Sequence, residues 1–195
     1  AIKSAAEAEY ARWDNGARRE FEPEMKPIVT SYFEAGGSLC ASLDPIADPW
    51  SASFISYVMK KAGVSDFPGR CAHTQYFKAV HDNPGTCRTY PMSERGRIAV
   101  GDIVCRCRPS ETDKCSGDYN NAFGHSHCYI VVNVIGDGKV EVIGGNVNDN
   151  VEKRIVDVSR DESPEKKWYG FISCEIHAVP SVSAAGKTDL RGKPT

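Results

Sequence analysis

The sequence has neither a long basic run nor a long apolar segment, and it contains no internal repeat. Lys and Arg number 24 against 26 Asp and Glu, which leaves a formal net charge of -2. Proteins that bind a phosphate backbone need clustered Lys and Arg, so we expect no nucleic-acid partner. A membrane-spanning helix needs about 20 apolar residues, and no segment approaches that length. We therefore expect no membrane span.

The spacing of Cys and His residues also lacks the pairs that are typical of structural zinc sites. Neither a C-x-x-C pair nor an H-x(3–5)-H pair occurs. The Cys and His residues that do lie close together are Cys105, Cys107, Cys115, His125, His127 and Cys128. Without the zinc spacing, this cluster favours disulfides over a metal, and we expect no cofactor.

Cysteine itself is abundant. The chain has 8 cysteines, an even number that is high for a protein of 195 residues and favours up to four disulfides in an oxidising compartment. Their connectivity stays open, because eight cysteines can pair in many ways. The start at Ala1 fits either removal of a signal peptide or an arbitrary boundary. We expect a periplasmic or secreted protein.

Hydrophobic periodicity divides the chain into a helical first half and a strand-rich second half. In the first half, the spacing predicts helices over 1–14, 25–36, 48–63 and 72–81. From residue 98 the period becomes two, which predicts strands over 102–107, 127–134, 139–143, 151–158 and 168–177. Segment 87–97 contains Pro91 and is expected to be irregular. Residues 180–195 are rich in Ser, Gly, Lys and Pro and are expected to form a disordered tail.

Helices that come first and strands that come last are typical of an α+β fold. We expect one domain over residues 1–179, with the helices packed on one face of a meandering antiparallel sheet of four or five strands. The helix over 48–63 is apolar nearly all round and is expected to be buried. Asp48 is its predicted N-cap and Pro49 its first residue, which puts Ser51 in the first turn.

Three polar residues are candidates for a catalytic site, because this fold would bring them close together. Ser51 begins the buried helix, His127 begins the first strand of the clearest hairpin, and Asn146 follows the second strand of that hairpin. If the helix N-terminus packs against the sheet, the hairpin ends lie beside Ser51. Each residue also has a structural explanation: a first-turn serine, a strand-end histidine and a turn-forming asparagine. His73 lies on an apolar helix face, and a histidine in such a position is more often a buried core residue than a catalyst.

Four motifs, in order, resemble those of papain-like cell-wall hydrolases of the NlpC and CHAP type. Residues 50–55 (Trp-Ser-Ala-Ser-Phe-Ile) resemble the nucleophile motif Pro-Trp-Cys-Ala-Ala-Phe, and residues 101–104 (Gly-Asp-Ile-Val) the Gly-Asp turn. Residues 126–132 (Ser-His-Cys-Tyr-Ile-Val-Val) look like the histidine strand, and residues 143–147 (Ile-Gly-Gly-Asn-Val) the Leu-Gly-Gly-Asn turn. The likeness covers about 48–150 and extends to an uncharacterised bacterial branch with Ser in this motif.

The resemblance implies a papain-like fold and hydrolysis of amide bonds in peptidoglycan stem peptides. Ser51 would be the nucleophile, His127 the base and Asn146 the residue that orients the base. We expect Trp50, His73, Asp102 and His125 to contribute to substrate binding. The family's nucleophile is a cysteine, and a helix dipole helps to ionise a thiol but not an alcohol. Ser51 therefore depends on a base that takes its proton during attack.

Other interpretations keep the same fold. Cys128 is an alternative nucleophile, although neighbouring strand residues face opposite sides, so that it would point away from a pocket lined by His127 and instead pair with Cys105. The domain is alternatively an inactive binder of cell-wall glycan or peptide, or an envelope binding or immunity protein. A hydrolase of this kind fits an antibacterial effector with a secretion or immunity partner as well as a housekeeping enzyme.

Overall fold

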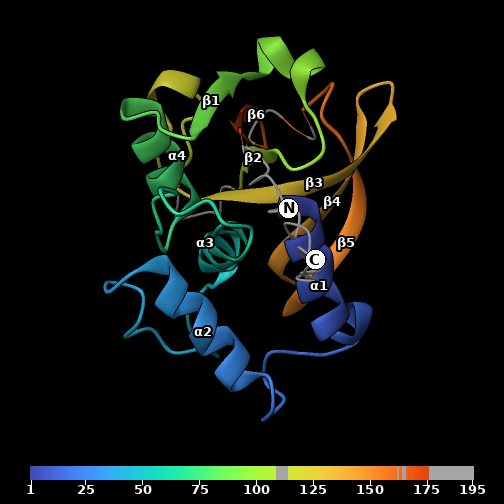
Figure 1. Cartoon of the computed structure of the whole chain (residues 1–195). Coiled ribbons are helices and arrows are strands. Elements are labelled where there is room, and N and C mark those ends of the chain that lie inside the picture. Colours follow the sequence, from blue (N-terminus) through green and yellow to red (C-terminus); the bar gives the residue numbers. More distant parts are fainter. Residues whose placement is uncertain (109–113, 162, 164–165, 176–195) are drawn as a thin grey trace, which may run out of the picture.

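The computed structural model describes residues 1–108, 114–161, 163 and 166–175, and within these it has an α+β fold (Figure 1). The helices are α1 (Ile2–Arg12), α2 (Lys26–Gly36), α3 (Ser51–Lys61) and α4 (His73–Asp82). The strands are β1 (Cys87–Pro91), β2 (Ile103–Cys107), β3 (Ser126–Gly136), β4 (Lys139–Val147), β5 (Asn150–Asp157) and β6 (Trp168–Cys174). The predicted tail over 180–195 lies outside the described residues.

The strands form one open antiparallel sheet in the order β1-β6-β2-β3-β4-β5. Strands β2 to β5 form the predicted meander, but β6 departs from it and inserts between β2 and β1. The sheet has six strands instead of the predicted four or five. The additional strand is the edge strand β1, in a segment that was expected to be irregular. Because Pro91 is the last residue of an edge strand, its missing N–H costs the sheet no interior hydrogen bond.

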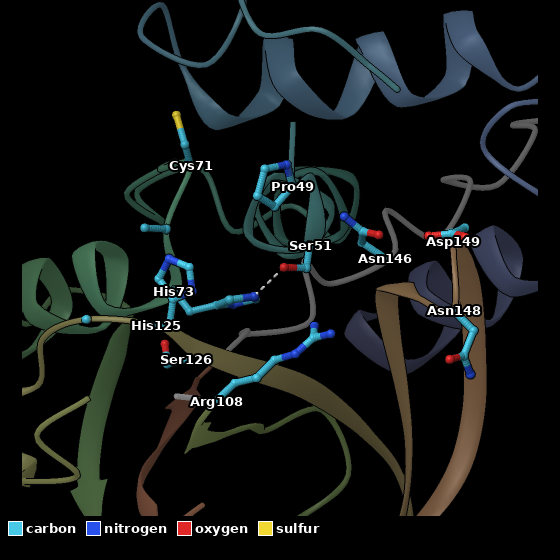
Figure 2. Close-up of a pocket in the computed structure, with 12 residues that line it drawn as sticks. Pro49, Ser51, Cys71, His73, Arg108, His125, Ser126, Asn146, Asn148 and Asp149 are labelled. Atoms are coloured by element: carbon cyan, nitrogen blue, oxygen red, sulfur yellow. Dashed lines mark hydrogen bonds between the residues drawn. The ribbon is translucent and has the colours of Figure 1, made fainter. Parts of the chain in front are cut away.

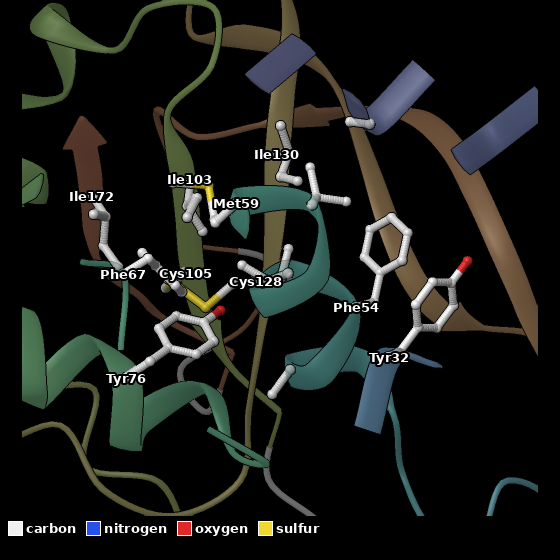
Figure 3. Close-up of a cluster of buried hydrophobic side chains, with 14 of the residues drawn as sticks. Tyr32, Phe54, Met59, Phe67, Tyr76, Ile103, Cys105, Cys128, Ile130 and Ile172 are labelled. Carbon is white, nitrogen blue, oxygen red and sulfur yellow. A yellow bond between two sulfur atoms is a disulfide. The ribbon is translucent and has the colours of Figure 1, made fainter. Parts of the chain in front are cut away.

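Helix α3 lies between α2 and the sheet, and it contacts strands β3 and β4 (Figure 1). Its apolar side chains, among them Phe54 and Met59, are buried together with sheet residues Ile103 and Ile130 (Figure 3). This confirms the prediction of a buried central helix. Burying such side chains is the main source of folding free energy, and here it fixes where α3 begins relative to the ends of β3 and β4.

All eight cysteines lie among the described residues, and all are paired. The disulfides are Cys40–Cys71, Cys87–Cys174, Cys105–Cys128 and Cys107–Cys115. The predicted disulfides are thus confirmed, including the pairing of Cys105 with Cys128, which are opposite each other on β2 and β3. Four disulfides indicate an extracytoplasmic location. No helix in the described part of the chain is long and apolar enough to cross a membrane.

The disulfides are expected to differ in their contribution to stability. Cys87 and Cys174 are 87 residues apart, and Cys107 and Cys115 only 8. Removing the long-range bridge with Cys87→Ala and Cys174→Ala should lower the free energy of unfolding by about 4.5 kcal/mol, against about 2.5 kcal/mol for Cys107→Ala and Cys115→Ala, because the longer loop restricts the unfolded chain more. Urea denaturation of both double variants measures this, and a larger loss for the short bridge would contradict it.

Candidate functional site

Helix α3 begins at Ser51 without a side-chain cap. The prediction that Asp48 caps this helix was wrong, because the Asp48 carboxylate accepts a hydrogen bond of 2.8 Å from the backbone N–H of Asp44 instead. Trp50 occupies the N-cap position and makes no side-chain capping bond. The first N–H groups of a helix have no partner within the helix. The start of α3 therefore presents backbone donors and the positive end of the helix dipole beside Ser51.

Ser51 is hydrogen-bonded to the first residue of a second helix. The Ser51 Oγ lies 2.7 Å from Nε2 of His73, which begins α4 (Figure 2). On the other side of the ring, His73 Nδ1 lies 2.6 Å from the hydroxyl of Tyr76, three residues further along the same helix. Residues three apart share a helix face, so α4 supplies both the histidine and the group that orients it. Ser51, His73 and Tyr76 form one hydrogen-bonded chain.

Burial keeps the hydrogen-bonded side chains of His73 and Tyr76 uncharged. Burial, aided by the nearby charge of Arg108, lowers the pKa of His73 from 6.5 to about 3, so the imidazole is uncharged at neutral pH. Burial raises the pKa of Tyr76 well above 10, so the phenol stays protonated. The positions of the heavy atoms are compatible with either neutral tautomer of His73. With the proton on Nδ1, His73 donates to Tyr76 and accepts from Ser51; with the proton on Nε2, it donates to Ser51.

Ser51 and His73 line an open pocket of about 690 Å³ (Figure 2). The other residues of its wall are Pro49, Cys71, Ala72, Arg108, Gly124, His125, Ser126, Asn146, Asn148 and Asp149. These come from four places that are distant in sequence: the start of α3, the start of α4, the end of β2 with the start of β3, and the turn between β4 and β5. The wall is rich in hydrogen-bonding and charged groups, which suits a polar ligand.

The backbone around Asn146 has an unusual conformation that turns this part of β4 toward the pocket. The pairing of β4 with β5 shifts register between Gly144 and Val147, and Asn146 has a positive φ of 55°. A bulge of this kind re-aims a side chain, and non-glycine residues with positive φ often cluster at functional sites. In Figure 2, Asn146 and His73 lie on opposite sides of Ser51. The structure thus brings Asn146 and Ser51 to one pocket.

His127 packs against the ring of His73 and is not among the residues of the pocket wall. Only 2% of His127 is exposed, its ring centroid is 5.1 Å from that of His73, and neither ring nitrogen has a hydrogen-bond partner. A Cβ on Gly144 would lie 3.2 Å from its Nε2, so the glycine leaves space for this ring. Burial, followed by the charges of His73 and three arginines, lowers the pKa of His127 well below 6.5. The histidine in contact with Ser51 is His73.

Two of the residues predicted to bind substrate lie outside the pocket wall. Trp50 is fully buried, stacks on Trp13 with ring centroids 5.0 Å apart, and donates its indole N–H to Glu20. Asp102 lies at the opposite end of β2 from the pocket residue Arg108, about 20 Å away along a strand that rises about 3.3 Å per residue, and accepts a hydrogen bond from the N–H of Ala99. The other two predicted residues, His73 and His125, line the pocket.

Cys128 has no thiol to act as a nucleophile, because it is bonded to Cys105 beneath α3 (Figure 3). Within the described ranges, no group of three or more His, Cys, Asp or Glu side chains is placed to hold a metal ion.

Sequence reasoning missed Tyr76 and Arg108. The signal for Tyr76 was its spacing of three residues from a histidine on a predicted helix. Arg108 immediately follows the last residue of β2, and only the pairing of β2 with β3 brings it to the start of the histidine strand.

A family model described as "Uncharacterized protein conserved in bacteria (DUF2272)" matches residues 23–163, which include every residue of the pocket wall. No curated protein and no solved structure matches the chain significantly.

The buried histidines predict a loss of stability in acid. Because the folded-state pKa of His127 is depressed, the unfolded chain binds a proton below pH 6.5 that the folded chain does not, so stability present above that pH is lost as the pH falls. As the pH falls from 6.5 to 4.5, the free energy of unfolding of the wild type should fall more than that of His127→Gln. Denaturant unfolding at a series of pH values tests this, and parallel curves for the two proteins would contradict it.

Proposed function

We propose that this chain, which belongs to the DUF2272 family of bacterial proteins, hydrolyses amide bonds in cell-wall peptides with Ser51 as its nucleophile and His73 as its base. The observation that carries the proposal is the 2.7 Å hydrogen bond between Ser51 Oγ and His73 Nε2, made at the wall of an open polar pocket. A hydroxyl bonded to a neutral imidazole, which a third group orients, is the arrangement that activates a serine.

The reaction follows from the positions of these groups. Ser51 Oγ attacks the carbonyl carbon while its proton passes to Nε2 of His73, and the resulting imidazolium gives that proton to the leaving amine as the C–N bond breaks. A water molecule then attacks the acyl ester with His73 again as base, which releases the acid and restores Ser51. Tyr76 accepts the Nδ1–H bond and so holds the ring in the tautomer that this step needs.

The start of α3 supplies the means to stabilise the oxyanion. Since no side chain caps the helix, its first N–H groups are available to a ligand at Ser51. In this proposal, the backbone N–H groups at the start of α3 donate hydrogen bonds to the attacked carbonyl oxygen as charge develops on it. Asn146, from the bulge in β4, adds a polar side chain to the same wall.

The substrate class and the papain-like fold rest on the four motifs described above, which resemble those of cell-wall hydrolases. The order of elements agrees with the resemblance, since a buried helix carrying Ser51 precedes the β3–β4 hairpin with His127 and Asn146. A bacterial family and four disulfides suit an enzyme that works on peptidoglycan in the periplasm or outside the cell. The role of base moves from His127 to His73, and His127 packs against the His73 ring to position it.

A second candidate function, binding of cell-wall peptide or glycan without catalysis, is favoured by the pKa of His73. A base is most effective when its pKa is near the working pH, and burial with the charge of Arg108 lowers this pKa to about 3. Combined with a serine in place of the nucleophilic cysteine of papain-like cell-wall hydrolases, such a weak base suits a pocket that binds its ligand through neutral hydrogen bonds. An envelope binding or immunity protein would use the pocket in this way.

Mass spectrometry of purified peptidoglycan incubated with the protein separates the two functions. Wild type should release products with new amine and carboxyl ends, and Ser51→Ala or His73→Gln should lower the rate about 10³-fold or more, since each removes an essential part of the chain of proton transfer. His127→Gln should lower it only about 10-fold, because His127 acts by positioning the His73 ring.

Two outcomes would contradict the proposal. If the wild type binds peptidoglycan but releases no product, hydrolysis is contradicted and the binding function is supported. A larger loss for His127→Gln than for His73→Gln would return the role of base to His127.

A further inference from the structure

We propose that Arg108 binds a carboxylate of the substrate, so that the pocket selects peptides with a free carboxylate close to the attacked amide bond. This inference rests on the proposed function, since it names the substrate feature that the same pocket recognises. It is carried by the position of Arg108 in the wall, by how its backbone is held, and by the absence of an ion-pair partner for it among the residues that the structure describes.

The backbone of Arg108 is fixed at the base of the pocket. Arg108 follows Cys107, whose disulfide with Cys115 ties the end of β2 to the far side of the loop. Its N–H donates a hydrogen bond of 2.9 Å to the carbonyl oxygen of His125, just before β3. The side chain extends from this anchored point along the pocket wall, on the Ser51 side (Figure 2). The long side chain thus has a fixed origin and an open path to a ligand.

The charge of Arg108 has no partner among the described residues. Some of the other arginines pair with carboxylates, since Arg18 lies 2.8 Å from Glu22, Arg97 lies 2.8 Å from Glu94, and Arg160 lies 3.0 Å from Asp157, whereas exposed arginines such as Arg88 and Arg95 form no ion pair with a described carboxylate. No such ion pair is formed by Arg108, although its charge reaches far enough to act on both His73 and His127. A guanidinium presents a planar fork of donors that matches a carboxylate with two parallel hydrogen bonds.

Binding a carboxylate here would also affect the base. The positive charge of Arg108 disfavours the imidazolium form of His73 and contributes to its low pKa, after burial. A substrate carboxylate paired with Arg108 cancels that charge, so the pKa of His73 rises and the imidazole takes the Ser51 proton more readily. The correct substrate then improves the base that attacks it, and a peptide without the carboxylate leaves the base weak.

Binding measurements on Ser51→Ala test this assignment without requiring turnover. The probes are a synthetic stem tripeptide with a free C-terminal carboxylate and the same peptide as its C-terminal amide, followed by calorimetry. In a second pair of probes, the side-chain carboxyl is free in one peptide and amidated in the other. Comparison of the two pairs identifies which carboxylate is bound. At least one free acid should bind about 10-fold more tightly than its amide, a modest ratio because Arg108 is exposed to solvent.

Variants assign that preference to Arg108. Arg108→Gln in the Ser51→Ala background should remove the preference, and Arg108→Lys should keep part of it. Arg88→Gln is the matched control, because Arg88 is an exposed arginine on β1, outside the pocket wall, and it should keep all of it. In nuclear magnetic resonance titrations, the free acid but not the amide should raise the pKa of His73, and Arg108→Gln should abolish that difference.

The results separate this inference from the proposed function. Equal binding of acids and amides, binding of none of the probes, or a preference that survives Arg108→Gln would overturn the role of Arg108. If wild type hydrolyses acids and amides at equal rates, the proposed function stands and the inference fails. If the preference depends on Arg108 but wild type hydrolyses none of the probes or sacculi, the inference stands and the hydrolase fails.

Discussion

The hydrogen bond between Ser51 and His73 depends on two helices that begin at the same place. Ser51 is the first residue of α3 and His73 the first of α4, and burial of α3 against the sheet fixes one of these starts. The Cys40–Cys71 disulfide fixes the other, since it ties the chain two residues before His73 to the segment after α2. The 2.7 Å contact is therefore a consequence of core packing and a covalent link, and the pocket forms around it.

The electrostatics of the site follow from where the sheet ends. The junction of β2 and β3 brings Arg108 to the pocket and packs His127 against His73, so that two buried neutral imidazoles lie near a guanidinium that forms no ion pair with any described residue. Burial of the two imidazoles costs stability in acid, because each resists protonation. Strongly shifted pKa values are more frequent at functional sites than elsewhere, and a bound carboxylate would offset the effect of the Arg108 charge on both imidazoles. The charges around the pocket thus agree with the proposed carboxylate ligand.

The sequence predicted the local elements well and the non-local contacts poorly. Helical spacing located α3, and alternation located the β3–β4 hairpin, because both depend on neighbouring residues. Strand β1 was missed because it exists only through pairing with β6, more than 80 residues later, which the Cys87–Cys174 bridge closes. Ser51 and Asn146 were selected from their positions at element ends. Which histidine contacts Ser51 was not predictable, since it depends on how α4 sits against β3, and the bulge that turns Asn146 is set by pairing with β5.

Covalent labelling of Ser51 shows whether His73 activates the serine, and it needs no knowledge of the substrate. A fluorophosphonate probe reacts with serines that a neighbouring base activates. If His73 activates Ser51, wild type should carry one adduct per molecule, located on Ser51 by peptide mass spectrometry. His73→Gln should lose the adduct, while His127→Gln should still react. No adduct on Ser51 in the wild type, or labelling that is unchanged by His73→Gln, would contradict the activation of Ser51 by His73.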